Sequence, residues 1–283
     1  MKITGKFAFL ILSAAALCFI APGCASPRSE KPDDYMSSDD QAPTYKLKWE
    51  DDYYNVNAGQ QIVNIRTGEW SAMAEAQLYL VYDNLVASLN CKSQTALMAE
   101  QAKWLKARNR KAKTIADEFE GGTLGPAESS SVRGNWNSKR LQTLGIRLGK
   151  LKNQNPPTVK ANCLPSKLVW FPSIFILSSD EDFWADEMVK RDKYRTWHHW
   201  EEFQDMKLQV AYAYLNLNLP ANEWQSVAKE SESWPEEKSH LLAQSAASAD
   251  EKDKLLGRAA SKRFAGLETR FAILKFSPDP SGN

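Results

Sequence analysis

An internal repeat constrains the fold of this 283-residue chain more than any other feature of its sequence. When the sequence is compared with itself at a shift of 130 residues, many positions carry the same residue type in both copies. These pairs are Trp70 with Trp200, Leu78 with Leu208, Tyr82 with Tyr212, Leu85 with Leu215, Leu89 with Leu219, Glu100 with Glu230, and Trp104 with Trp234. Helical stripes of leucine match one another by chance, but paired tryptophans do so far less easily. The repeat therefore predicts two structurally related units.

A shift of 123 residues extends the repeat toward the C-terminus. It pairs Lys139 with Lys262, Arg140 with Arg263, Leu144 with Leu267, Arg147 with Arg270, and Leu151 with Leu274. One gap of seven residues, in the loop before the third helix, reconciles the two shifts.

Within the first copy, apolar residues recur at the three- and four-residue spacing of helices. The stripes are Leu78, Tyr82, Leu85 and Leu89; then Leu97, Gln101, Trp104 and Arg108; then Leu141, Leu144, Leu148 and Leu151. The segment Gly121–Pro126 breaks the chain between the second and third stripes, and Asn155-Pro156-Pro157 ends the third. The pattern predicts an all-α fold, a helical bundle built from two related three-helix units.

Two segments depart from this regular pattern. The apolar stretch 167–177, "KLVWFPSIFIL", is either a strand or an extended segment packed across the bundle, and Pro172 argues against a central strand. In the second copy Pro235 directly follows Trp234 and precedes two glutamates, a pattern that predicts the start of a helix rather than its middle.

The first residues have the pattern of an export signal. Lys2 and Lys6 precede fifteen apolar residues, Phe7–Ala21, a stretch too short to span a bilayer comfortably. The following Ala-Pro-Gly-Cys resembles a lipobox, which predicts cleavage before Cys24 and its lipidation. Ordinary cleavage after Ala25 is the alternative, and both imply export. Residues 26–60 are rich in Ser, Asp and Pro, which predicts a disordered tether.

The net charge limits the kinds of partner that this chain can bind, and the cysteines bear on its disulfides. Removal of residues 1–23 takes away two lysines and no acid, so the formal net charge changes from +1 to −1. A general polyanion binder would be basic, so we expect no nucleic-acid partner. Cys91 and Cys163 either form a disulfide or remain two buried thiols.

A basic run follows in the second predicted helix, with six basic residues between Lys103 and Lys113. Most of its charge lies opposite the stripe that contains Trp104 and Arg108, so it predicts a solvated face; a patch for an anionic surface is the alternative. Arg108 lies on the apolar side and needs an internal carboxylate, for which Glu75 and Glu100 are candidates.

The first copy resembles the N-terminal domain of the LprI-like lysozyme inhibitor family. The residues that carry the resemblance are Tyr82, Leu85, Gln101, Trp104, Arg108, Gly121, Gly122 and Arg147. The second copy is degenerate, with Ser231 in place of Gln101, Lys238 in place of Arg108, and no Gly-Gly loop. The resulting organisation is a signal peptide (1–23), a tether (24–60), an LprI-like helical domain (61–155), a connector (156–190), a degenerate second repeat (191–275) and a tail (276–283).

The resemblance implies an exported envelope lipoprotein that binds and inhibits lysozyme and so protects peptidoglycan. It would be lipid-anchored to a bacterial membrane and face the periplasm or the cell surface. The candidate contact is the acidic glycine loop, whose residues are Asp117, Glu118, Glu120, Thr123 and Leu124. A plain helix–helix connection is the alternative reading of this loop. An envelope interaction or assembly protein without inhibitory activity is the alternative function.

No motif in the sequence indicates catalysis or a cofactor. His198 and Glu202 would share a helix face, but His240 is the only histidine outside the His198-His199 pair, so a full metal-ligand set is hard to assemble. The carboxylates form no recognisable acid–base motif, and nucleophile elbows and phosphate loops are absent from the sequence. We therefore expect a protein that is not an enzyme and holds neither metal nor cofactor.

Overall fold

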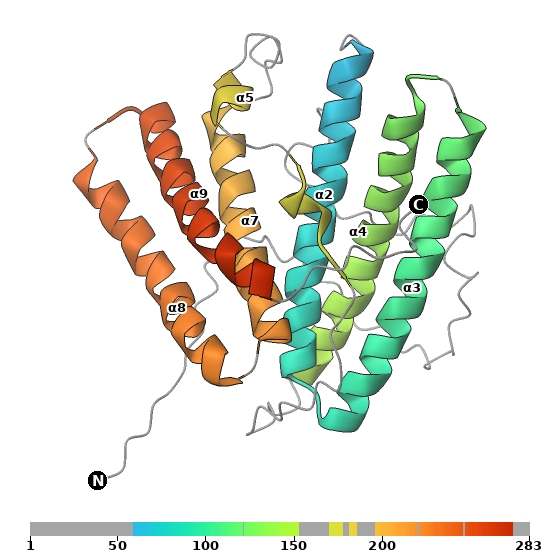
Figure 1. Ribbon diagram of the computed structural model, residues 1–283, viewed down its shortest axis with the longest axis horizontal. Coiled ribbons are helices and arrows are strands. Elements are labelled where there is room, and N and C mark those ends of the chain that lie inside the picture. The colour runs from blue at the N-terminus through green and yellow to red at the C-terminus, as the bar shows by residue number, and fades with distance from the viewer. Residues whose placement is uncertain are drawn as a thin grey trace. The chain divides into compact units, whose positions relative to one another are not determined.

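Six long helices make up most of the chain that the structure describes (Figure 1). The computed structural model describes residues 59–120, 122–152, 170–177, 181–185, 196–219, 221–245 and 247–273, and no strand occurs among them. The first unit contains α2 (Gln60–Ala87), α3 (Cys91–Glu118) and α4 (Gly125–Lys152); the second contains α7 (Trp197–Asn218), α8 (Ala221–Gln244) and α9 (Ala249–Ile273). The predicted all-α fold of two related three-helix units is confirmed.

Local sequence explains where several helices begin. The Asn90 side chain caps α3 by accepting a hydrogen bond of 3.0 Å from the Ser93 N–H. Thr196 caps α7 in a reciprocal arrangement with His199. Gly125 and Pro126, which the sequence indicated as a break, are the first residues of α4, because a proline in the first turn sacrifices no helical hydrogen bond.

Pro235 lies inside α8, which continues to Gln244, so the predicted helix start at this proline is wrong. A proline removes one helical hydrogen bond and usually interrupts a helix. Here Arg263 of α9 donates a hydrogen bond of 2.7 Å to the carbonyl of Glu230, in the turn before the proline. This contact joins α9 to the turn of α8 that precedes the proline.

The two units share one packing device, a tryptophan pressed against a glycine. A Cβ atom on Gly134 would lie 2.0 Å from Trp70 Cζ3, and one on Gly257 would lie 2.3 Å from Trp200 Cζ3. Only glycine permits this approach between α2 and α4, and between α7 and α9. The tryptophans match at the shift of 130 and the glycines at the shift of 123, so the structure reproduces the repeat at the level of side chains.

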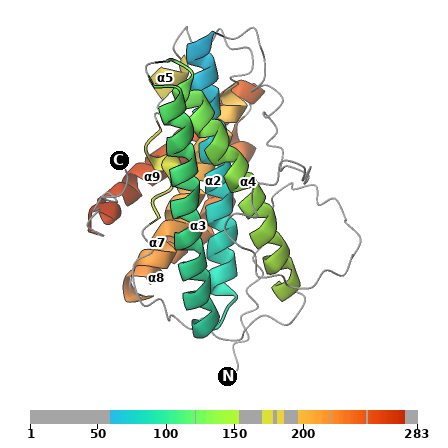
Figure 2. The same cartoon turned by 90° about the vertical axis from the view of Figure 1, so that its right-hand side faces the viewer.

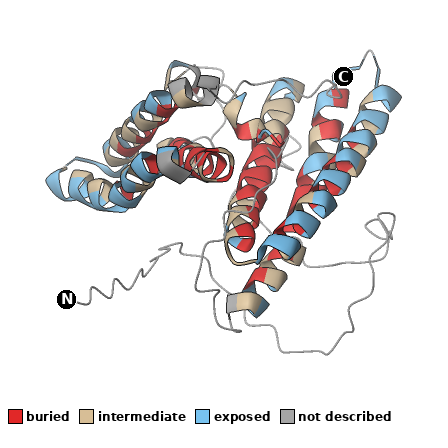
Figure 3. Cartoon of the chain, turned by 60° about the horizontal axis from the view of Figure 1, so that its bottom comes forward, coloured by how far each residue is buried: buried red, intermediate tan, exposed pale blue. Residues whose placement is uncertain are grey.

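The first helices of the two units, α2 and α7, pack on each other at the centre. Tyr79 contacts Tyr214 with ring centroids 6.2 Å apart, and Asn216 donates a hydrogen bond of 2.9 Å to Asp83. Tyr79 precedes Asp83 on α2, and their partners Tyr214 and Asn216 follow in the same order on α7. The two helices therefore run in the same direction (Figure 1). Figure 3 shows the buried residues gathered on the central helices and the exposed ones along the outer helices. All described residues belong to one compact unit, residues 39–283.

The connector crosses this central seam. Residues 170–172 are extended, η2 (Ser173–Phe175) is one turn of 3-10 helix, and α5 (Glu181–Ala185) follows. Phe175 stacks on Phe264 of α9 at 5.7 Å and meets Tyr214 of α7 edge-on at 6.0 Å. Of the two readings of segment 167–177, the strand is wrong for its described residues, 170–177, which pack across the bundle.

Several predictions lie outside the described residues: the signal peptide, Cys24, nearly all of the tether, Gly121, Cys163 and the tail. Cys91 is disulfide-bonded, and its pairing with Cys163 stays a prediction. Among the described helices, none is both long and apolar enough to cross a bilayer.

Candidate interaction site

A buried ion pair ties α3 to α2 in the first unit. Arg108 Nη1 lies 2.7 Å from Glu75 Oε1, with side-chain exposures of 7% and 4%. The same nitrogen donates to Asn137 Oδ1 of α4 at 2.8 Å, and Asn137 Nδ2 donates to the Ser71 carbonyl at 3.1 Å. Of the two carboxylates expected for Arg108, the structure therefore pairs it with Glu75, and the pair holds all three helices in register.

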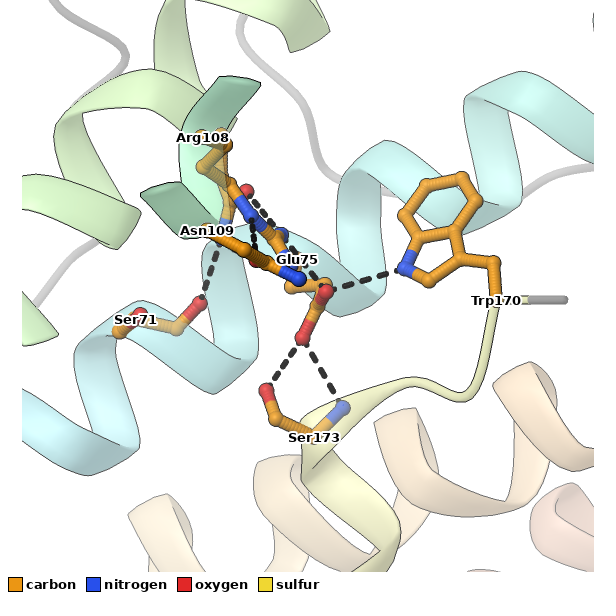
Figure 4. A network of polar contacts seen from close by, with 7 residues as sticks. Ser71, Glu75, Arg108, Asn109, Trp170 and Ser173 are labelled. Atoms are coloured by element: carbon orange, nitrogen blue, oxygen red, sulfur yellow. Dashed lines mark hydrogen bonds and ion pairs between the residues drawn. The ribbon is translucent and has the colours of Figure 1, made fainter. Parts of the chain in front are cut away.

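The connector supplies the remaining donors to Glu75. Trp170 Nε1 donates to Oε1 at 3.0 Å, and the Ser173 N–H donates to Oε2 at 2.9 Å, joined by the Ser173 hydroxyl (Figure 4). Burial raises the pKa of Glu75, but the charge of Arg108 and the hydrogen bonds from Ser173, Trp170 and Arg108 lower that pKa below its ordinary value. The carboxylate is therefore ionised at neutral pH and fully paired.

A second polar layer joins α3 to α4 through Arg140, whose side chain is fully buried. Its Nε donates to Gln101 Oε1 at 3.0 Å, and its Nη2 lies 2.7 Å from Glu100 Oε1. Arg147 reaches the other oxygen of Glu100 at 2.9 Å. Two guanidinium groups lie over the Trp104 ring, Arg108 at 5.4 Å and Arg140 at 5.8 Å from its centroid.

The residues that carry the family resemblance mostly lie in this interior. Leu85 is fully buried, and Tyr82 is buried with its ring edge-on to Trp170 at 5.6 Å. Gln101, Trp104 and Arg108 are buried, Arg147 is half-buried on α4, and Gly122 lies in the exposed turn after α3. Except at that turn and at Arg147, the residues that carry the resemblance offer little surface to a partner.

The turn between α3 and α4 is the part of the first unit that projects functional groups outward. Asp117, Glu118, Glu120 and Thr123 are exposed. Two apolar side chains accompany them: Phe119 is 37% exposed and Leu124 is 44% exposed. The turn therefore combines exposed carboxylates with partly exposed apolar groups.

The backbone of this turn is held in place from within and from α2. The Gly122 N–H donates to the Phe119 carbonyl at 2.9 Å, and the Phe119 N–H donates to the Ala116 carbonyl at 3.2 Å. Asn64 Nδ2 of α2 donates to the Thr123 carbonyl at 3.0 Å. A turn fixed in this way loses little conformational entropy when it binds.

No protein-family model, no curated protein and no solved structure matches this chain.

The second unit places a different polar group at the position of the Glu75–Arg108 pair. The shift of 130 pairs Asp205 with Glu75 and Lys238 with Arg108. Lys238 Nζ lies 3.2 Å from Asp205 Oδ2 and 2.6 Å from Glu201 Oε1. Trp234 Nε1 of the same unit donates to Asp205 Oδ1 at 2.7 Å. One cation thus bridges two carboxylates, and the described connector residues, 170–177 and 181–185, take no part in these contacts.

The carboxylates of the two centres also differ in pKa, because that of Glu75 is lowered and that of Glu201 is raised. Burial raises the pKa of Glu201; the hydrogen bond and charge of Lys238 lower it and Asp205 raises it, and the net shift is upward. Burial lowers the pKa of Lys238, but Asp205 and Glu201 raise it above its ordinary value. The Lys238 side chain is 27% exposed, against 7% for Arg108, so water screens this group more than its counterpart.

Other contacts repeat between the units. The Arg263 guanidinium lies 5.1 Å from the Trp234 ring centroid, as Arg140 does over Trp104. Arg270 Nη2 lies 2.7 Å from Glu230 Oε1, the counterpart of the Arg147–Glu100 pair. The turn between α8 and α9 differs, because its sequence, "SAAS" at 245–248, carries no acid and no glycine.

The histidines take structural positions. His198 lies 3.3 Å from Glu202 on the same helix face, His199 takes part in the α7 cap, and His240 contacts Gln244 at 3.2 Å. Among the described residues, no group of three or more His, Cys, Asp and Glu side chains is placed to hold a metal ion.

Sequence reasoning missed Gly134, Gly257, Asn137, and the use of Trp170 and Ser173 as donors to Glu75. The two glycines carried a usable signal, since they match at the same shift of 123 as the Lys-Arg pairs. The connector carried none, because its part of the network joins residues 95 to 98 positions apart.

Proposed function

We propose that this chain is an exported envelope lipoprotein, anchored through Cys24, that binds a lysozyme-type glycoside hydrolase through its α3–α4 turn and protects peptidoglycan. The supporting observation is that turn: exposed carboxylates and apolar side chains on a backbone held by Asn64. The protein acts by binding and has no catalytic step of its own. The export pattern and the resemblance of residues 70–151 to LprI-like inhibitors support the same function.

The carboxylates and the apolar residues take different parts in the proposed contact. Lysozymes are commonly basic, so Asp117, Glu118 and Glu120 accelerate encounter and orient the partner. Phe119 and Leu124, already partly exposed, supply area that loses water on binding. Loops placed on a rigid scaffold commonly carry binding residues, and the buried polar layers hold together the helices that carry this turn.

The test is inhibition of peptidoglycan digestion. The mature chain with Cys24→Ser, added in micromolar excess, should slow several lysozymes acting on purified peptidoglycan. Reversing the charges of the turn in Asp117→Lys/Glu118→Lys/Glu120→Lys should weaken inhibition by about tenfold or more, because like charges then face each other across the contact.

The matched control reverses three exposed acids elsewhere: Glu232→Lys/Glu236→Lys/Asp250→Lys. It makes the same change in net charge and should leave inhibition within about threefold of the parent. Equal losses in both triple variants would show that net charge rather than the turn matters. No slowing of any lysozyme by the parent chain would refute the proposed function.

A further inference from the structure

The outward side of α3 carries a ridge of positive charge, defined by Lys92, Lys103, Lys106, Arg110 and Lys113. At 100° per residue these five positions lie within one narrow sector of the helix, opposite the buried Trp104 face. Four of the five are lysines, and all five are exposed. At 1.5 Å per residue the ridge is about 32 Å long.

The charge of the ridge is largely uncompensated. Within the described residues, only Lys113 forms an ion pair, with Asp117 at 3.4 Å, and both side chains are more than 60% exposed. Such an exposed pair contributes little. Glu100, the acid in the middle of α3, is directed to Arg140 and Arg147 of α4. The four remaining cations therefore face water.

The position of α3 leaves this ridge open. α3 packs mainly on α4 and lies at the end of the row of helices in Figure 1. Figure 2 shows α3 in front of α2, with α4 beside it. A straight helix at an edge can touch a flat surface along its whole length, which a ridge inside a concave site cannot do.

The second unit provides an internal comparison. The shift of 130 places Ser233, Glu236, His240 and Ala243 of α8 where α3 has Lys103, Lys106, Arg110 and Lys113. The α8 helix is also an outer helix, packed on α7 and α9. An outer helix of this fold therefore does not need a basic face, and the ridge belongs to the first unit alone.

We propose that the α3 ridge binds the anionic headgroups of a phospholipid surface. Lysines are flexible point charges that suit many mobile phosphates rather than one fixed partner. Binding to single-stranded nucleic acid normally adds stacking aromatic residues, and Trp104 is buried on the opposite side of the helix. The interaction is independent of lysozyme binding and orients the folded part against the membrane.

The test is co-sedimentation of the mature chain with vesicles, carrying Cys24→Ser so that no acyl chain contributes. Vesicles of equal parts phosphatidylglycerol and phosphatidylcholine should bind the chain, and pure phosphatidylcholine vesicles should not. Binding should be lost at 1 M salt, where charges are screened within about 3 Å.

Neutralising the ridge in Lys103→Gln/Lys106→Gln/Arg110→Gln should weaken binding by about 100-fold, because each basic residue near an anionic surface contributes about a fivefold factor. The matched control is Lys150→Gln/Lys229→Gln/Lys262→Gln, three exposed lysines on other helices, which should change binding by less than about threefold. Circular dichroism checks that both variants remain folded.

A transplant tests sufficiency. Ser233→Lys/Glu236→Lys/His240→Arg on α8, placed in the ridge-neutralised background, should restore binding to anionic vesicles. Equal losses in the ridge variant and its control would overturn the proposal, as would equal binding to both vesicle types. Tighter binding to duplex DNA than to anionic vesicles would also overturn it, since the ridge would then be a general polyanion patch.

Discussion

The two units of this protein share the aromatic contacts that pack their helices together, but they differ in the polar group at the centre of each unit. Both press a tryptophan onto a glycine and place an arginine over a second tryptophan. In the first unit the centre is the Glu75–Arg108 pair, closed over by connector residues. In the second it is Lys238 between two carboxylates, in a more exposed position.

The difference shows which parts of a duplicated unit are free to change. Apolar and stacking contacts fix the helix geometry, so both copies keep them. The acidic turn and the basic ridge also belong to the first unit, which therefore carries both proposed binding surfaces. Three experiments probe this comparison.

The largest expected effect comes from the central carboxylates. Glu75→Gln leaves Arg108 as an uncompensated buried charge and should lower the free energy of unfolding by about 3–5 kcal/mol. Asp205→Asn should cost about 1 kcal/mol, because Lys238 keeps Glu201 and is partly exposed to water. Urea denaturation of both variants measures the difference.

Acid provides a second measurement on the same pair of proteins. The folded-state pKa of Glu75 lies below its ordinary value of 4.5, so its stabilisation is complete above that pH and is lost as the pH falls through the folded-state pKa. The gap between the parent and Glu75→Gln should therefore shrink on acidification below pH 4.5. Similar losses for Glu75→Gln and Asp205→Asn would remove the distinction between the two centres.

An intermediate and equal effect is expected at the tryptophan–glycine contacts. Gly134→Ala and Gly257→Ala should each destabilise the protein by about 2 kcal/mol, because the added methyl overlaps a buried indole. Gly145→Ala and Gly266→Ala are the controls on the same helices. A Cβ there meets nothing within 4 Å, so they should stabilise by up to about 1 kcal/mol. A loss of stability in only one of the two variants would mean that the tryptophan–glycine contacts of the two units are not equivalent.

The smallest effect is expected at two partly exposed arginines. Arg147→Gln and Arg270→Gln each remove one partner of a solvent-accessible ion pair and should lower the free energy of unfolding by less than about 1 kcal/mol. Thermal unfolding resolves such a change. A loss of several kcal/mol for Arg147 alone would assign it a structural role in the first unit that its counterpart lacks.

Much of the fold followed from local rules. Helical spacing located the three long helices of the first unit, and the repeat predicted their counterparts in the second before any contact was known. The side of α3 on which Arg108 lies led to a buried partner, with Glu75 as one of two candidates, because a cation on an apolar stripe needs an internal acceptor. Such inferences succeed when the deciding residues lie within one or two helical turns.

Contacts between distant segments could not be predicted in this way. Nothing near Trp170 or Ser173 in the sequence indicates a carboxylate on α2 as their acceptor. Pro235 was misread because local preference favours a helix start, whereas α8 continues through the proline to Gln244. The outer position of α3, on which the proposed membrane contact depends, is likewise a property of the assembled helices.

The docking of the connector has a consequence for how the protein unfolds. Chains of repeats often lose one repeat at a time, because each is stabilised mainly by its neighbours. Here the segment that completes the hydrogen bonds of Glu75 also stacks Phe175 on Phe264 of α9. Unfolding of either unit would remove contacts that stabilise the other, so we expect the whole folded part to unfold in a single cooperative transition.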